Sequence, residues 1–189
     1  MNIPAPLDPV AELKNRYPDE VLHVKTFRNE TTIIVNGANI VAVMMFLRNT
    51  AGLVYNYLSD ISTVDYYPAD YGEGFDGTSN DFRPERFAVS YHLYSMLYNR
   101  RLRVKVFANE ENPAVPSITT VWPAANWLER EAMDLMGITF ENHPDPRRLL
   151  LPEDWDGHPH RRDVPMGKET VAFSFNIDEI TRHKPHAEK

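Results

Sequence analysis

The segment from Glu129 to Pro165 constrains the fold of this chain more than any other stretch. It begins as the end of a helix, because Leu135 and Met136 continue an apolar face at helical spacing. Gly137 follows the last apolar position, where a left-handed residue commonly ends a helix. Prolines recur through the rest of the segment, so no long regular element can follow.

The proline-rich stretch also carries side chains that favour contact. Arg147–Arg148 and Arg161–Arg162 flank Trp155. Arginine beside an aromatic residue is the composition of interface hot spots. The pattern predicts a compact domain of residues 1–137 and an extended docking arm of residues 138–189.

The composition excludes several classes of protein. The 189 residues suit one domain with a tail, and a formal net charge of −7 gives no support to nucleic-acid binding. The longest apolar run, Ile40–Leu47, is too short to span a membrane. Because the chain has no cysteine, it has no cysteine ligand for an iron–sulfur cluster. The first residues resemble neither a signal peptide nor a transit peptide, which predicts a protein kept in a bacterial cytoplasm.

Periodicity predicts an α+β domain, with a mostly antiparallel or mixed sheet and a few helices packed on it. In one strand Leu102 and Val104 alternate with Arg101, Arg103 and Lys105, which predicts a buried side and a basic, solvent-facing side. The expected helices are 8–17, 40–48 and one ending at 137. The expected strands lie within 21–27, 31–35, 54–67 (with a break near 59–60), 87–98, 101–106, 117–122 and 171–175. Two loops are expected, a long one at 68–84 and a second one at 109–116.

Four residues of the arm, His143, Asp145, His158 and His160, are of the types that bind zinc or iron. Prolines separate them, however, and no second cluster supports a metal site. We expect the imidazoles to hydrogen-bond backbone groups of the arm or of a neighbour, because an extended segment cannot satisfy its own backbone.

The helix before Gly137 carries the carboxylates Glu129, Glu131 and Asp134. Paired carboxylates suit acid–base chemistry. Here Arg130 lies among them, four residues from Asp134, so an i, i+4 pair and an ion-pair network against a partner are favoured. The glycine-rich stretch 72–77 lacks nucleotide-binding spacing and its acidic residues would repel phosphate, so it indicates a surface loop.

The segment from Glu129 to Pro165 resembles the signature of the family of subunits designated C in proton-pumping NADH:quinone oxidoreductase, respiratory complex I. The similarity extends upstream through Trp122–Trp127, Tyr91–Ser95 and Tyr57–Asp65, and it covers roughly residues 40–165. Methionines stand at positions 133 and 136 where this family more often has aromatic residues. Both are apolar, so the resemblance holds.

The resemblance implies a non-redox structural subunit of the hydrophilic arm, on the cytoplasmic side of the bacterial membrane. It would brace the subunits that hold the clusters and the quinone. FMN, the iron–sulfur clusters and quinone would be bound by partner subunits, with no cofactor and no catalytic residue in this chain. The expected interface residues are Glu129, Glu131, Arg147, Arg148, Trp155, His158, Arg161 and Arg162.

Two alternatives remain open. One is an equivalent subunit of a membrane-bound hydrogenase, or of a quinone oxidoreductase with another electron donor. The other, from a different class, is an independent metal-dependent hydrolase using His143, Asp145 and His158.

Overall fold

The computed structural model describes residues 4–67 and 82–164. Its first helix, α1 (Pro9–Arg16), begins where predicted: the Asp8 carboxylate accepts hydrogen bonds from Val10 N and Ala11 N, and Pro9 occupies the first turn. The hairpin β1 (Val21–Phe27) and β2 (Glu30–Val35) follows as expected. A short 3₁₀ helix, η1 (Gly37–Asn39), then leads into α2 (Ile40–Asn49).

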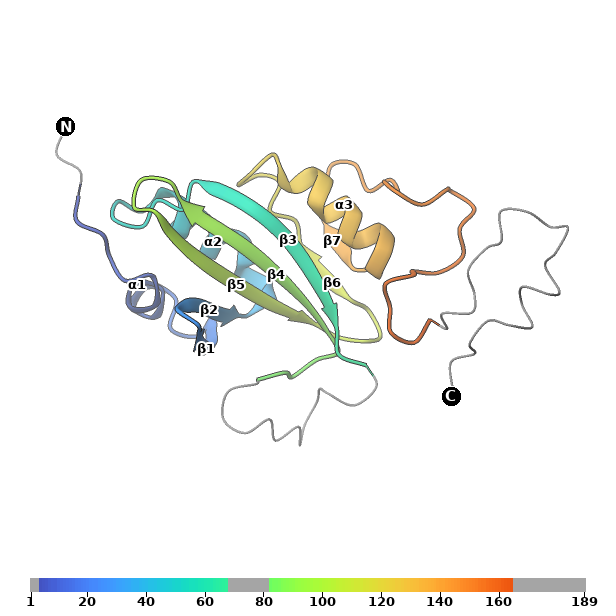
Figure 1. The fold of residues 1–189 in the computed structure, drawn as a ribbon, viewed down its shortest axis with the longest axis horizontal. Helices are drawn as coiled ribbons and strands as arrows, with labels where there is room; N and C mark the ends of the chain where they lie inside the picture. Colours follow the sequence, from blue (N-terminus) through green and yellow to red (C-terminus); the bar gives the residue numbers. More distant parts are fainter. Residues whose placement is uncertain (1–3, 68–81, 165–189) are drawn as a thin grey trace, which may run out of the picture.

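A mixed sheet of five strands forms the centre of the molecule (Figure 1). Its remaining strands are β3 (Tyr57–Asp65), β4 (Phe87–Ser95) and β5 (Arg100–Ala108). The strand order is β1-β2-β5-β4-β3, with β2 and β5 parallel and all other neighbours antiparallel. The predicted break in β3 is confirmed as a register shift between Leu58 and Asp60.

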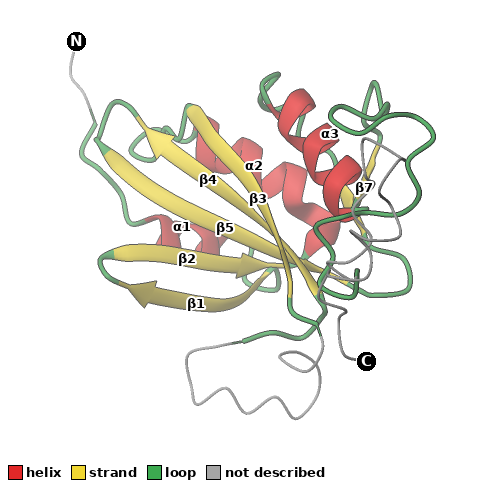
Figure 2. Ribbon diagram, turned by 45° about the vertical axis from the view of Figure 1, so that its right-hand side comes forward, coloured by secondary structure: helices red, strands yellow, loops and turns green. Residues whose placement is uncertain are grey.

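The helices lie on one side of this sheet (Figure 2). The core between them is apolar: Tyr91, Val104 and Val106 of the sheet, and Met44 and Leu47 of α2, are fully buried. The third helix, α3 (Ala125–Met136), packs beside β3. The alternation predicted for residues 101–106 is confirmed, because Leu102, Val104 and Val106 are buried while the basic side chains between them reach the surface.

Two sequence-based expectations about local structure are wrong. Residues 117–122 form turns instead of a strand, with Val121 N and Trp122 N both donating to Ile118 O. The strand lies earlier, at β6 (Ala114–Pro116), within the stretch 109–116 that was expected to be a loop. It pairs in parallel with β7 (Thr139–Glu141), a contact between distant segments that local periodicity does not encode.

The chain beyond α3 continues along the domain (Figure 1). Gly137 adopts the expected left-handed conformation, with φ of 73°. Ile138 and Phe140 of the predicted arm are buried in the core. Most of the predicted loop at 68–84, the predicted strand at 171–175 and the arm after residue 164 lie outside the described residues. The division at residue 137 therefore stays a prediction.

Candidate functional site

The strap, as we name residues 142–164, is held on α3 by one buried carboxylate. Asp134 is 1 % exposed, and its Oδ2 accepts backbone N–H groups from Leu149, Leu150 and Leu151 at 2.8–3.0 Å. Its Oδ1 accepts from Arg148 Nη1 at 2.9 Å. Burial alone would raise the pKa of Asp134, but these donors outweigh it and hold the pKa below its usual value.

Arg130, one turn before Asp134, uses its side chain to bind backbone carbonyl groups of the strap. Arg130 Nε donates to Arg147 O at 2.9 Å and Nη2 donates to Arg148 O at 3.0 Å. The expected Arg130–Asp134 pair is therefore wrong: each side chain is directed to the strap, and Asp134 takes Arg148 as its cationic partner. An extended chain that cannot satisfy its own backbone receives donors and acceptors from α3.

The C-terminal end of α3 is capped by the last part of the strap. Arg161 Nε donates to Met136 O at 2.9 Å, and Nη2 donates to Gly137 O at 3.3 Å. His158 Nδ1 lies 2.9 Å from Asp134 O. These contacts satisfy carbonyl groups that a helix end leaves without partners and place positive charge at the negative end of the helix dipole. A side chain at position 137 would clash with His158 and Arg161, which explains the glycine.

A second attachment joins the strap to the sheet. Arg86, 3 % exposed, forms a two-pronged pair with Asp65, at 2.9 Å for both Nε–Oδ1 and Nη2–Oδ2. Arg86 Nη2 is also 2.9 Å from Asp163 Oδ2. Asp65 Oδ2 in turn accepts Arg162 N at 2.9 Å. Neither Arg86 nor Asp65 was predicted as a site residue from the sequence, because their partners lie far along the chain.

Glu129 lies inside the protein, with no exposed surface. Its carboxylate accepts from Ser117 Oγ at 2.6 Å and from Ile118 N at 2.8 Å, which fixes the turn at residues 117–122. Burial raises the pKa of Glu129 to about 7, although both hydrogen bonds act to lower it. Glu129 was predicted as an interface residue; in the described chain it has no exposed surface, and its hydrogen-bond partners Ser117 and Ile118 are buried.

Glu129→Gln is expected to make the protein progressively more stable than the wild type as the pH rises. The unfolded carboxyl releases its proton near pH 4.5 and the folded one near pH 7, so the folded wild type loses stability across that interval. The difference in free energy of unfolding between variant and wild type should grow by roughly 1–3 kcal/mol from pH 5 to pH 8, measured by urea titration. Glu131→Gln, on the exposed side of the same helix, is the matched control. A difference that stays constant with pH would contradict the assignment.

Two of the three histidines of the strap, His143 and His158, hydrogen-bond backbone groups, as predicted. His143 Nδ1 accepts Asp145 N at 3.0 Å, so the proton is on Nε2, which donates to Asn126 O at 3.1 Å. Both ring nitrogens of His143 are thereby engaged, and one of His158 is. Within residues 4–67 and 82–164, no group of three or more His, Asp or Glu side chains is arranged to hold a metal ion. The same residues contain no helix long and apolar enough to cross a membrane.

Three exposed side chains define what we call the α3–strap surface: Trp127, Arg147 and Leu150. Trp127 is 61 % exposed, Leu150 is 60 % exposed, and the Arg147 side chain is 78 % exposed. Arg130 links Trp127 to the strap, because its guanidinium lies 5.1 Å from the Trp127 ring centre and donates to the backbone of Arg147 and Arg148. Leu150 N is held by Asp134, one turn further along α3. Neither Trp127 nor Leu150 was among the interface residues predicted from the sequence, although a tryptophan on a helix that precedes an arginine-rich segment was a usable signal.

The other predicted interface residues lie on α3 or on the strap, and they differ in how exposed they are. Glu131 and Arg162 are exposed. Arg148, Trp155, His158 and Arg161 are half-buried, and all but Trp155 direct side-chain nitrogens to α3 or its end. Trp155 contributes its carbonyl oxygen, which accepts Arg148 Nη2 at 3.0 Å.

The fold and this surface define the protein as an α+β domain whose C-terminal strap folds back along a helix beside the sheet. The model of the family described as "Respiratory-chain NADH dehydrogenase, 30 Kd subunit" matches residues 33–170. Among curated proteins, the subunit designated C of the NADH-quinone oxidoreductase of Roseiflexus castenholzii is 43 % identical over 180 residues, which cover 95 % of each chain. Its counterpart in Geotalea uraniireducens is 42 % identical over 157 residues, covering 83 % of this chain and 86 % of its own.

A solved structure shares the fold. It is described as "Nqo5 of the trypsin-resistant fragment (1-134) in P63 form" and is 30 % identical, with a TM-score of 0.57, covering 73 % of this chain and 99 % of its own. The chain therefore belongs to the family of the 30 kDa subunit of respiratory-chain NADH dehydrogenase, as a subunit of the NADH-quinone oxidoreductase complex, complex I. The resemblance stated from the sequence is confirmed.

Proposed function

We propose that this chain is a non-redox structural subunit of the hydrophilic arm of complex I, held on the cytoplasmic side of the membrane. It braces the subunits that carry the terminal iron–sulfur clusters and the quinone site. FMN, the clusters and quinone are bound by those partners. The absence of cysteine from the whole sequence supports this role, because thiolates are the usual ligands of such clusters.

The observation that carries the proposal is the α3–strap surface. Asp134, Arg130 and Arg161 fasten the strap within the chain, so the exposed groups project from a rigid support. A tryptophan and an arginine held in this way match the composition of interface hot spots, and the leucine adds exposed apolar area. A pre-organised surface loses less conformational entropy when a partner binds than an extended free arm does.

Trp127→Ala is expected to weaken incorporation of the chain into the complex without changing the unfolding temperature of the isolated protein. Truncating a tryptophan anchor at an interface commonly costs about 2 kcal/mol or more of binding free energy. Trp127 contributes little to the core because most of its surface is exposed. The measurement is the amount of partner subunits recovered from membranes through an affinity tag on this chain, after a wash at fixed salt.

Met45→Ala, at an exposed apolar position of α2, is the matched control and should leave recovery unchanged. Iron and flavin should appear in the recovered complex and be lacking from the purified chain alone. Stoichiometric iron or flavin in the isolated chain would contradict the non-redox role. Recovery of hydrogenase subunits in place of NADH- and FMN-binding ones would favour the equivalent subunit of a hydrogenase.

A further inference from the structure

The side of the sheet opposite the helices carries a regular pattern of polar side chains. Strand pairing places Thr32, Arg103, His92 and Asp60 in one row across β2, β5, β4 and β3. Along β5, Arg101, Arg103 and Lys105 succeed one another on this side at every second residue. In the part of the chain that the structure describes, no helix covers this side (Figure 2). We call it the open sheet face.

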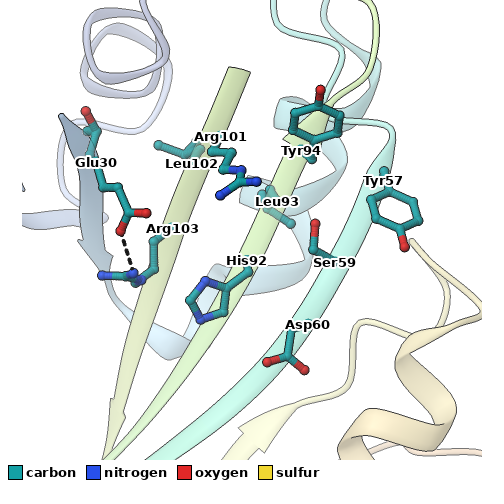
Figure 3. Close-up of a pocket in the computed structure, with 11 residues that line it drawn as sticks. Glu30, Tyr57, Ser59, Asp60, His92, Leu93, Tyr94, Arg101, Leu102 and Arg103 are labelled. Atoms are coloured by element: carbon teal, nitrogen blue, oxygen red, sulfur yellow. Dashed lines mark hydrogen bonds and ion pairs between the residues drawn. The ribbon is translucent and has the colours of Figure 1, made fainter. Parts of the chain in front are cut away.

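Two hollows on the open sheet face share Glu30 and Arg103 in their lining. The first has a volume of about 500 Å³ and the second about 230 Å³. Figure 3 shows the side chains of the first hollow, which come from β2, β3, β4 and β5. Among the described residues, the charged side chains that line the two hollows are five basic and two acidic: Lys25, Arg83, Arg101, Arg103 and Lys105, against Glu30 and Asp60.

The charge of the open sheet face is opposite to that of the whole chain, which carries a formal net charge of −7. Part of the positive charge is already engaged: Arg103 Nη2 lies 2.9 Å from Glu30 Oε2, and Lys25 and Arg83 also have interaction partners, which leaves Arg101 as the exposed basic side chain on which the test below relies. Burial, and then the neighbouring Arg103, lower the pKa of His92, so its ring is neutral at pH 7. Large apolar groups border the basic centre: Phe27 is 59 % exposed and Tyr57 is 52 % exposed.

We propose that the open sheet face binds an acidic, extended polypeptide segment of a neighbouring subunit of the complex. Charge complementarity identifies the occupant as acidic. The spacing of the basic side chains identifies it as extended, because alternate side chains of a strand repeat at about 6.6 Å along the chain, as Arg101, Arg103 and Lys105 do. The inference rests on the proposed function, since the occupant belongs to the same assembly, but it concerns a surface separate from the α3–strap surface.

Site-specific cross-linking in membranes that contain the assembled complex tests the proposal. Tyr57 is replaced by the photo-reactive residue p-benzoylphenylalanine, and the matched control places the same residue at Met45, on the helical side of the domain. We expect the Tyr57 probe to form an adduct with a partner subunit, and mass spectrometry should locate that adduct within a segment rich in Asp and Glu. The Met45 probe should give no adduct with that segment.

Arg101→Glu should lower the yield of the Tyr57 adduct by about tenfold, because like charges across an interface repel strongly. Lys14→Glu makes the same change in net charge on α1 and should leave the yield unchanged. An adduct with lipid, with residues 68–81 of the same chain or with a segment lacking acidic residues would overturn the proposal, as would no adduct. If a probe at Trp127 still reaches a partner subunit in that case, the proposed function stands and this inference alone fails.

Discussion

Asp134→Asn is expected to release the strap and to accelerate tryptic cleavage at its arginine pairs about a hundredfold. The carboxylate of Asp134 is the shared acceptor of Leu149 N, Leu150 N, Leu151 N and Arg148 Nη1. An asparagine amide turns an NH₂ group toward donors, so it cannot accept all four bonds. Breaking a buried pair in this way costs about 3 kcal/mol or more.

The expected acceleration follows from the opening equilibrium of the strap. When local opening is fast relative to cleavage, the cleavage rate follows the population of the open form. A change of about 3 kcal/mol in the free energy of opening alters that population roughly a hundredfold. Cleavage after Arg147, Arg148, Arg161 and Arg162 can be followed by mass spectrometry.

Asp145→Asn is the matched control for this experiment. Asp145 binds the exposed Arg147 at 2.6 Å and lies 3.7 Å from Arg130 Nη1, beyond hydrogen-bond distance, and partly exposed pairs of this kind contribute about 0–1 kcal/mol. Its cleavage rate should stay within several-fold of the wild-type rate. Equal rates for Asp134→Asn and the wild type would show that the strap is attached mainly by other contacts, such as the pair between Arg86 and Asp163.

Local signals in the sequence predicted most of the secondary structure. The Asp8–Pro9 start of α1, the hairpin of β1 and β2, and the alternation along β5 are each encoded within a few neighbouring residues. The order of the strands and the parallel pairing of β2 with β5 are not encoded locally, because β2 and β5 are about 70 residues apart in the sequence. The small sheet of β6 and β7 was missed for the same reason.

The α3–strap surface lies in the same part of the chain as the interface residues predicted from the sequence, and the contacts of individual residues were harder to predict. Composition alone cannot show that Arg148 and Arg161 act within the chain, on Asp134 and on the end of α3. Each of these arginines could pair with acceptor groups of its own chain or with those of a neighbouring subunit, and only the path of the strap decides between the two. Trp127 presented the converse difficulty: a tryptophan in a helix is usually expected to be buried, and here most of it is exposed.

Removal of the chain from Asn142 onward is expected to leave a folded domain that does not enter the complex. The strands of the five-stranded sheet and β7 all precede this position, so their hydrophobic burial is retained. The truncated chain lacks Arg147, Leu150 and the strap that holds them, so the α3–strap surface is lost.

Hydrogen exchange on the truncated protein separates the contribution of the strap from that of the core. Amides of β4 and β5 should stay protected, whereas the last turn of α3 should exchange faster because it loses the caps from His158 and Arg161. A second truncation after Val164 keeps those caps and is the matched control. If β4 and β5 lose protection, the strap belongs to the folding core and residues 142–164 cannot be treated as a separate arm. If the chain truncated at Asn142 still enters the complex, docking depends on another surface, and the open sheet face becomes the first candidate.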